Sequence, residues 1–296
     1  MSQLLRNLSL TGVLLAGLST FAADAKDYAI QLTRKATVGE HYGFLADSSQ
    51  EQLVNVSVDG QAMPPRTVVT KVLITAAGEV LALTPAGRET KARFVIEKAV
   101  VSTGGPSVEL LPPGTEVVAE QTGGKTAFLV GGVPAKREIA HALDVAGIEM
   151  ASDEIASDDQ IFGTSARRKV GDSWPVNATA AAADLTKKGV TVEPGNLTGT
   201  TTLAEIVRSD NQDALRITST MAMKNVTPPL PPGIVVQSGE FNAAFFGIFP
   251  VDVTKRVIRS NMTMDGKFVC AGKTGDKDVA MTLTMKQSKD VTFSGK

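Results

Sequence analysis

The sequence predicts a mainly β protein made of two antiparallel β-sheet modules joined by a short helical connector. Most of the chain alternates apolar and polar residues with a period of two. Gly- and Pro-containing turns separate these segments, and only one stretch has a convincing helical period. The chain has 296 residues, which is enough for one large domain or two modest ones.

The first predicted module spans residues 26–131. Residues 67–75 and 79–84 are rich in β-branched and other apolar residues and flank the Gly-containing segment 76–78, a pattern typical of a β-hairpin. Further strands are predicted at residues 91–102, 108–111, 115–121 and 126–130, with Gly-Gly and Pro-Pro pairs between them.

The second predicted module spans residues 164–296. Its strands at 200–208 and 214–223 flank a turn-rich joint at residues 209–213. Mostly apolar residues recur at every second position of 214–223, so they share one face of that strand. Further strands are predicted at residues 239–248, 254–264, 267–271 and 279–285. Their alternation indicates a sheet with one apolar and one polar face.

The helical connector is predicted at residues 132–163. Pro134 suits a first helical turn. Apolar residues then follow at helical spacings of three and four: Ile139, Leu143, Ala146 and Met150. The Ser-Asp-Asp-Gln sequence at 157–160 fits a capping box for one more short turn, which is expected to end near Gly163.

The two modules share a V-G-[DE]-x-[YW] motif. A Thr-rich strand and then a hairpin turn, predicted at Gly78 and Asn211, follow the motif at similar distances, which predicts a degenerate internal duplication. Glycine permits a turn before the strand and the aromatic residue anchors that strand in the core, so the motif is interpreted as structural. Its residues are Val38, Gly39, Glu40 and Tyr42 in the first module, and Val170, Gly171, Asp172 and Trp174 in the second.

The V-G-D-x-W form of this motif at residues 170–174, followed by a long antiparallel meander, resembles exported bacterial proteins of uncharacterised function. The resemblance covers mainly residues 160–225 and extends to residues 34–84. It implies an exported β-rich protein, and it implies no activity and no functional residue.

Residues 1–25 are predicted to be a signal peptide. A short start containing Arg6 is followed by an apolar run at residues 8–21 and then by small residues, and cleavage is expected after Ala22 or after Ala25. No later stretch approaches the roughly 20 apolar residues of a transmembrane helix. We therefore expect an exported protein, periplasmic or extracellular, with no transmembrane segment after cleavage.

No catalytic motif stands out. Residues 123–126 end like a phosphate-binding loop, but Ala119 stands where that loop needs glycine, so a hairpin turn is predicted. His41 and His141 are too few for a typical zinc site, and His141 is expected on a solvated helix face. The one cysteine, Cys270, is predicted to be a buried, inert thiol. A net charge of −1 gives no electrostatic basis for nucleic-acid binding, and no cofactor is predicted.

Six methionines form the least generic pattern, because each pair or set projects to one face of its predicted strand. If these strands are neighbours, the thioethers converge and suit Cu(I) or Ag(I). A methionine-lined groove equally suits an apolar ligand, and a methionine-filled core explains the same pattern. The residues are Met221, Met223, Met262, Met264, Met281 and Met285.

The leading functional hypothesis is therefore non-catalytic. We expect a binding or envelope-associated protein that engages an apolar small molecule or an envelope protein. One alternative is a hydrolase-type enzyme whose site is assembled from residues scattered along the chain. A second alternative is soft-metal binding through the strand methionines.

Overall fold

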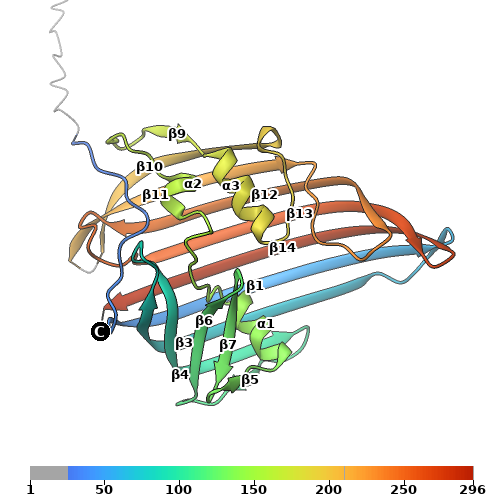
Figure 1. The fold of residues 1–296 in the computed structure, drawn as a ribbon, viewed down its shortest axis with the longest axis horizontal. Coiled ribbons are helices and arrows are strands. Elements are labelled where there is room, and N and C mark those ends of the chain that lie inside the picture. Colours follow the sequence, from blue (N-terminus) through green and yellow to red (C-terminus); the bar gives the residue numbers. More distant parts are fainter. Residues whose placement is uncertain (1–25, 210, 296) are drawn as a thin grey trace, which may run out of the picture.

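A computed structural model of the chain describes residues 26–209 and 211–295. The predicted signal peptide lies outside the described residues. The mainly β class is confirmed: the strands form one 14-stranded antiparallel sheet, and the helices are few and short (Figure 1). The order of its main strands is β8-β7-β6-β4-β3-β1-β14-β13-β12-β11-β10-β9, with β2 pairing to β1 and β5 pairing to β4.

The chain builds this sheet from two consecutive series of strands. The first series consists of β1 (His41–Val58), β2 (Gln61–Ala62), β3 (Arg66–Leu83), β4 (Glu89–Thr103), β5 (Val108–Leu111), β6 (Glu116–Thr122), β7 (Lys125–Val130) and β8 (Val133–Pro134). The second consists of β9 (Ser173–Pro175), β10 (Leu197–Ser209), β11 (Gln212–Lys224), β12 (Ile234–Pro250), β13 (Arg259–Thr274) and β14 (Lys277–Gly295). The helical elements are α1 (Arg137–Val145), α2 (Asp158–Phe162), α3 (Ala178–Lys187) and the short 3-10 helix η1 (Pro194–Asn196).

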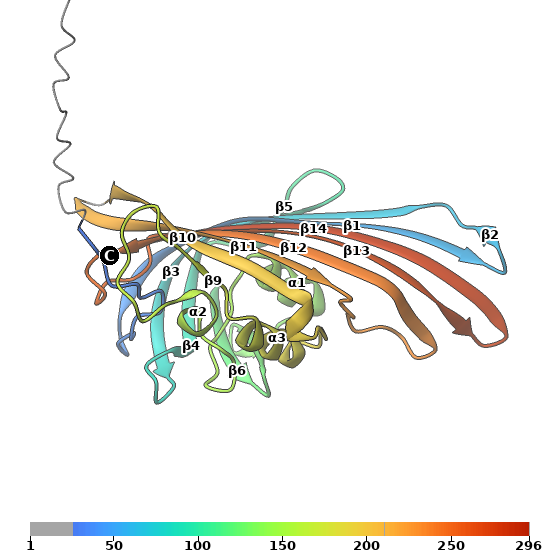
Figure 2. The same ribbon diagram turned by 90° about the horizontal axis from the view of Figure 1, so that it is seen from above.

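The two predicted modules meet in one continuous sheet because β1 pairs with β14. Their register runs from Tyr42 opposite Gly295 to Val58 opposite Val279, so these two strands pair over nearly their whole length. The sheet bends around α1, α2 and α3, which all lie on the same side of it (Figure 2). We call this side the helix face.

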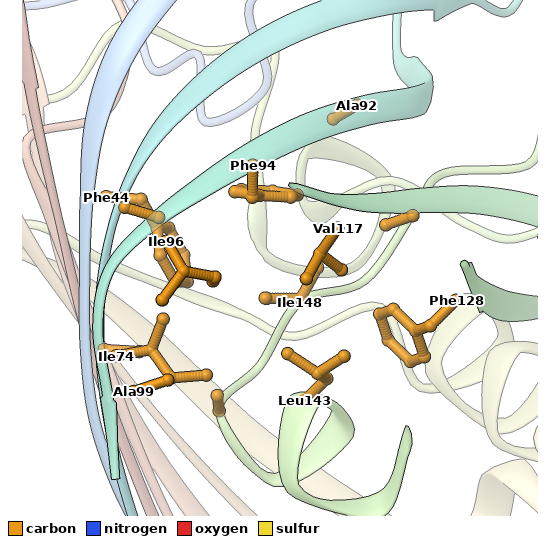
Figure 3. Packing of buried hydrophobic residues seen from close by; sticks show 14 of the residues in the cluster. Phe44, Ile74, Ala92, Phe94, Ile96, Ala99, Val117, Phe128, Leu143 and Ile148 are labelled. Atoms are coloured by element: carbon orange, nitrogen blue, oxygen red, sulfur yellow. The ribbon is translucent and has the colours of Figure 1, made fainter. Parts of the chain in front are cut away.

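Three apolar clusters fill the space between the sheet and its cover. The first lies under α1, where Leu143 points toward side chains of the sheet such as Ile74 and Val117 (Figure 3). The second lies under α2 and α3, where Ala181 packs with Phe268 and Met223 of the sheet. The third surrounds Trp174 and includes Ile30 and Leu32 from the N-terminal segment.

Several local predictions are confirmed. Asn211 adopts a φ of 59° in the turn between β10 and β11. The side chain of Ser157 accepts a hydrogen bond from the backbone N–H of Gln160. The side chain of Gln160 accepts one from the backbone N–H of Ser157, so the capping box is present. The short helix α2 ends at Gly163, as expected.

Other local predictions differ from the structure. Residues 76–78 form no turn: they lie inside β3, where Gly78 stands opposite Tyr42. Pro134 lies in β8 opposite Leu129, and α1 begins only at Arg137. The Ala-rich helix α3, which Asn177 caps by accepting a hydrogen bond from the backbone of Ala180, was not predicted.

The two V-G-[DE]-x-[YW] motifs have matching local geometry. Gly39 and Gly171 both have left-handed backbones, with φ of 81° and 92°, and Tyr42 and Trp174 are both buried. In each motif the glycine N–H donates to the carbonyl of a buried strand residue, and the N–H of that residue donates to the carbonyl of the acidic residue. The two distances are 2.9 and 3.0 Å for Gly39 and Glu40 with Val80. They are 2.8 and 3.0 Å for Gly171 and Asp172 with Leu203. The structural role predicted for the motif agrees with this geometry, and the duplication itself stays a prediction.

The Tyr42–Gly78 contact gives a first testable prediction. A Cβ atom at Gly78 would overlap the Tyr42 ring, so we expect Gly78→Ala to lower the free energy of unfolding by about 1–3 kcal/mol, the usual cost of overpacking. Chemical denaturation measures this. The control is Gly43→Ala, where a Cβ would meet chiefly the hydroxyl of Ser294, which can rotate away. Equal losses for the two variants would contradict the prediction.

Candidate functional site

A cavity of about 720 Å³ lies on the helix face of the sheet. Its walls come from the N-terminal segment, the starts of β1 and β4, the residues after α1, both α2 and α3, and strands β11 to β14. Most of the side chains that line it are apolar. They include Phe44, Phe94, Phe241, Phe249, Met221 and Met264.

Cross-strand register explains the apolar floor of the cavity. Met221 stands opposite Ala243, Ala243 opposite Met264, and Met264 opposite Gln287, so one row of side chains crosses four strands on the helix face. Ala243 is the smallest residue of this row and leaves room between its two methionine neighbours.

The structure distributes the six predicted methionines over the cavity and the neighbouring core. Met221, Met223, Met262 and Met264 line the cavity, whereas Met281 and Met285 pack in the cluster under α3. Strand β12 separates β11 from β13, so the methionine strands are not all neighbours. Among the described residues no group of three or more His, Cys, Asp or Glu side chains is placed to hold a metal ion. Soft-metal binding by the methionines stays a prediction.

The N-terminal segment runs along one wall of the cavity and is held there by Asp159. The carboxylate of Asp159 accepts hydrogen bonds from the backbone N–H groups of Leu32 (2.6 Å) and Thr33 (2.9 Å). The side chain of Leu32 is buried in the third apolar cluster, while Thr33 and Arg34 line the cavity. This arrangement joins the N-terminal segment to α2, far away in the sequence.

Arg256 is the centre of a charged network at the aromatic end of the cavity. Its guanidinium lies 3.8 Å from the centroid of the Tyr42 ring and forms ion pairs with Glu89 (2.6 Å) and Glu40 (3.2 Å). Arg34 also pairs with Glu40. Burial works to raise the pKa of Glu40, but the hydrogen bond from Arg34 and the charges of Arg256 and Arg34 lower it. Burial and the charge of Glu89 raise the pKa of Tyr42.

A second polar group links α3 to β14. Lys188 pairs with Asp184 (3.4 Å) and with Glu149 (3.7 Å), and Glu149 in turn pairs with Lys289 (3.4 Å). The Lys289 side chain is only 12% exposed. The Oδ1 atom of Asp184 is buried and has no hydrogen-bond partner among the described residues.

Asp158 lies beside this second group. Its side chain lines the cavity and remains exposed to solvent. Desolvation by the surrounding cavity walls, followed by the charge of Asp159, raises its pKa to about 6.

The two histidines, the cysteine and the Gly-Gly pair singled out in the sequence lie outside the cavity. His41 and His141 are exposed. Cys270 is buried, and burial raises the pKa of its thiol, as expected for an inert group. Gly123 and Gly124 both have positive φ in the turn between β6 and β7, which confirms the hairpin prediction.

Sequence reasoning missed the charged residues of the cavity. Arg256 contacts Glu40 and Glu89, which are far from it along the chain, so no local pattern connects them. The polar run at 47–52, which interrupts the apolar alternation inside β1, contributes only Gln50 to the cavity lining.

Comparison with known proteins found no matching family model and no matching curated protein. Lipovitellin, in a structure describing lipid–protein interactions, aligns with a TM-score of 0.37 at 8% identity, over 88% of this chain and 25% of lipovitellin. The outer membrane protein OprG from Pseudomonas aeruginosa aligns with a TM-score of 0.16 at 5% identity, over 88% of this chain and 99% of OprG.

A LolA superfamily protein from Nitrosomonas europaea aligns with a TM-score of 0.15 at 9% identity, over 84% of this chain and 86% of the LolA superfamily protein. The alignment with lipovitellin, by contrast, covers only a quarter of the lipovitellin chain. Scores this low support no functional conclusion. Within residues 26–209 and 211–295, no helix has the length and apolar character needed to cross a bilayer.

The Arg256 network gives the second prediction. Arg256→Met keeps the apolar stem on Tyr42 but leaves Glu40 and Glu89 without their shared cation. We expect the free energy of unfolding to fall by about 2–3 kcal/mol, because the three side chains are mostly buried. In the control, Arg208→Met, both partners of the ion pair are largely exposed, so a change below about 0.5 kcal/mol is expected. Similar denaturation curves for the two variants would refute the assignment.

Proposed function

We propose that this protein is an exported, non-catalytic binding protein that holds an apolar small molecule in the cavity on the helix face. One observation carries the proposal: the cavity has a volume of about 720 Å³, and apolar side chains form the majority of its lining, beside a substantial group of charged and polar ones. Ligand sites for small molecules typically have volumes of about 300–1,000 Å³ and predominantly apolar walls.

The chemistry of the lining supports an apolar ligand over a polar one. Methionine is flexible and polarizable, so four methionines give a surface that adapts to irregular apolar shapes. The arginine and glutamate groups at the aromatic end neutralise each other, so they form a framework for the cavity. The hydrolase and soft-metal alternatives from the sequence stay predictions.

Native mass spectrometry of the protein purified from its own export compartment tests the proposal directly. We expect a reproducible added mass that organic solvent extracts and that corresponds to an apolar molecule. A bare protein mass, together with no binding of a dansyl-labelled fatty acid by the purified chain, would overturn the proposal.

A variant that fills the cavity gives the third prediction. Ala243 is buried between Met221 and Met264, so Ala243→Phe places a ring where the ligand is proposed to lie. We expect the affinity for a dansyl-labelled fatty acid to fall at least tenfold, measured by fluorescence titration. The matched control is Ala244→Phe, because Ala244 is exposed on the opposite face of the same strand. Equal effects of the two substitutions would argue against a ligand in this cavity.

The pKa of Asp158 gives the fourth prediction. A bound apolar molecule excludes water from this carboxyl and so favours its protonated form. Affinity is therefore expected to be full well below pH 6 and to weaken as the pH rises through about 6, the pKa of Asp158. Lys188, Glu149 and Asp184 also face this carboxyl, so their charges affect the midpoint.

Asp158→Asn tests this assignment, because asparagine stays neutral throughout the range. We expect its affinity for the same probe to stay constant from pH 5 to 7.5, whereas the control Asp213→Asn, at an exposed site, keeps the wild-type profile. A wild-type affinity that does not change with pH would show that the ligand leaves this carboxyl solvated.

A further inference from the structure

Strands β1 and β14, at the centre of the sheet, extend well beyond the helices, toward hairpin tips that α1, α2 and α3 do not cover (Figures 1 and 2). On the helix face of this extension, three residues of β1 pair with three residues of β14: Val54 with Leu283, Val56 with Met281 and Val58 with Val279. All six side chains are half-buried. Leu283 and Met281 also pack against the second apolar cluster, whereas the four valines belong to none of the three clusters. We call these six residues the apolar strip.

The apolar strip continues the surface of the cavity. Gln50 and Gln287 stand opposite each other on the same two strands and both line the cavity. Leu283 lies four residues from Gln287, so both side chains point to the helix face. From Leu283 to Val279 the strip extends for about 14 Å, at about 3.4 Å per residue. That length is about half of the roughly 30 Å hydrocarbon thickness of a bilayer, which is the share of one leaflet.

Polar residues lie between the aromatic end of the cavity and the apolar strip. The helix face of β14 changes from Phe293 and Val291 to Lys289 and Gln287, and then to the apolar strip. The same face of β1 shows the same order: Tyr42, Phe44 and Ala46, then Ser48, Gln50 and Gln52, then Val54, Val56 and Val58. We call Ser48, Gln50, Gln287 and Lys289 the polar centre.

Two buried polar atoms near the polar centre lack partners among the described residues. Ser48 is 2% exposed and its Oγ makes no hydrogen bond, although Ser48 stands opposite Lys289. Asp184 is 8% exposed and its Oδ1 is likewise unpaired, next to the Lys188–Glu149–Lys289 group. Buried polar atoms without partners are rare in proteins, and a bound water, an ion or the polar group of a ligand can satisfy them.

We propose that the ligand is an amphiphilic lipid with two acyl chains. Its polar head lies at the polar centre, one chain occupies the cavity and the second chain lies on the apolar strip. Two apolar surfaces that diverge from one polar centre match the shape and polarity of such a molecule. The apolar strip is half-buried and no helix covers it, and its continuity with the cavity points to the same ligand. This inference rests on the proposed function.

The test compares a two-chain lipid with its single-chain counterpart. Isothermal titration calorimetry is carried out with dioctanoyl-phosphatidylcholine and octanoyl-lysophosphatidylcholine below their micelle concentrations. We expect the wild-type protein to bind the two-chain lipid at least tenfold more tightly. The variant Val56→Thr with Leu283→Gln makes the apolar strip polar at nearly constant volume, and we expect it to bind the two lipids alike.

The control makes the same two kinds of change on the opposite face of the sheet, where Val269 and Leu53 lie: Val269→Thr with Leu53→Gln. We expect it to keep the preference for two chains. Equal binding of both lipids by the wild-type protein, or a preference that survives in the strip variant, would overturn this inference and leave the proposed function standing. If neither lipid binds the wild-type protein, this inference fails, and the proposed function fails with it only if the protein also carries no added mass and does not bind the dansyl-labelled fatty acid.

A second copy of this chain, rather than a lipid, is the other occupant that could cover the apolar strip. Native mass spectrometry of the wild-type protein and of the strip variant distinguishes it. Monomers in both cases are expected for a lipid site. A wild-type dimer that the strip substitutions dissociate would show that a second copy covers the apolar strip, and would overturn the inference.

Discussion

The pairing of β1 with β14 is the constraint on which the rest of the structure depends. Without it, each series of strands would end in a long exposed edge, which sheet proteins normally avoid because unpaired backbone groups recruit other chains. The pairing covers two such edges at once. It also brings the helix faces of both series together, so that α1 from one side and α2 and α3 from the other enclose one cavity.

Charged residues are placed where the two series meet, and their pairing explains how they are tolerated there. A mostly buried ion is costly unless an opposite charge and hydrogen bonds compensate it. Arg256 lies between β12 and β13 and reaches Glu40 and Glu89 of the first series, while Lys289 of β14 reaches Glu149 after α1. Each group therefore ties the two series together at one end of the cavity. The neutral framework that results leaves methionines and aromatic rings to line the cavity.

Local patterns in the sequence predicted what depends on near neighbours, and failed where distant residues decide. The capping box at Ser157 and the turns at Asn211 and Gly124 follow from short-range chemistry, and all three are present. Gly78 was mistaken for a turn because its role, making room for the Tyr42 ring, depends on a strand far away in sequence. The helix α3 was missed because its alanines form a weak apolar stripe whose burial comes only from packing on the sheet.

The full length of β1 could not be predicted for a reason that bears on function. A strand with one buried face is recognised by strict alternation, and residues 47–52 break it because polar side chains occupy both faces. An inward polar residue such as Ser48 costs about 1–3 kcal/mol when its hydroxyl has no partner. A fold that needed only a stable core would place valine there, as it does at Val54 and Val56. A cavity that must hold a polar head between two apolar surfaces requires the interruption, so the feature that hid the strand in the sequence is the one that the proposed ligand explains.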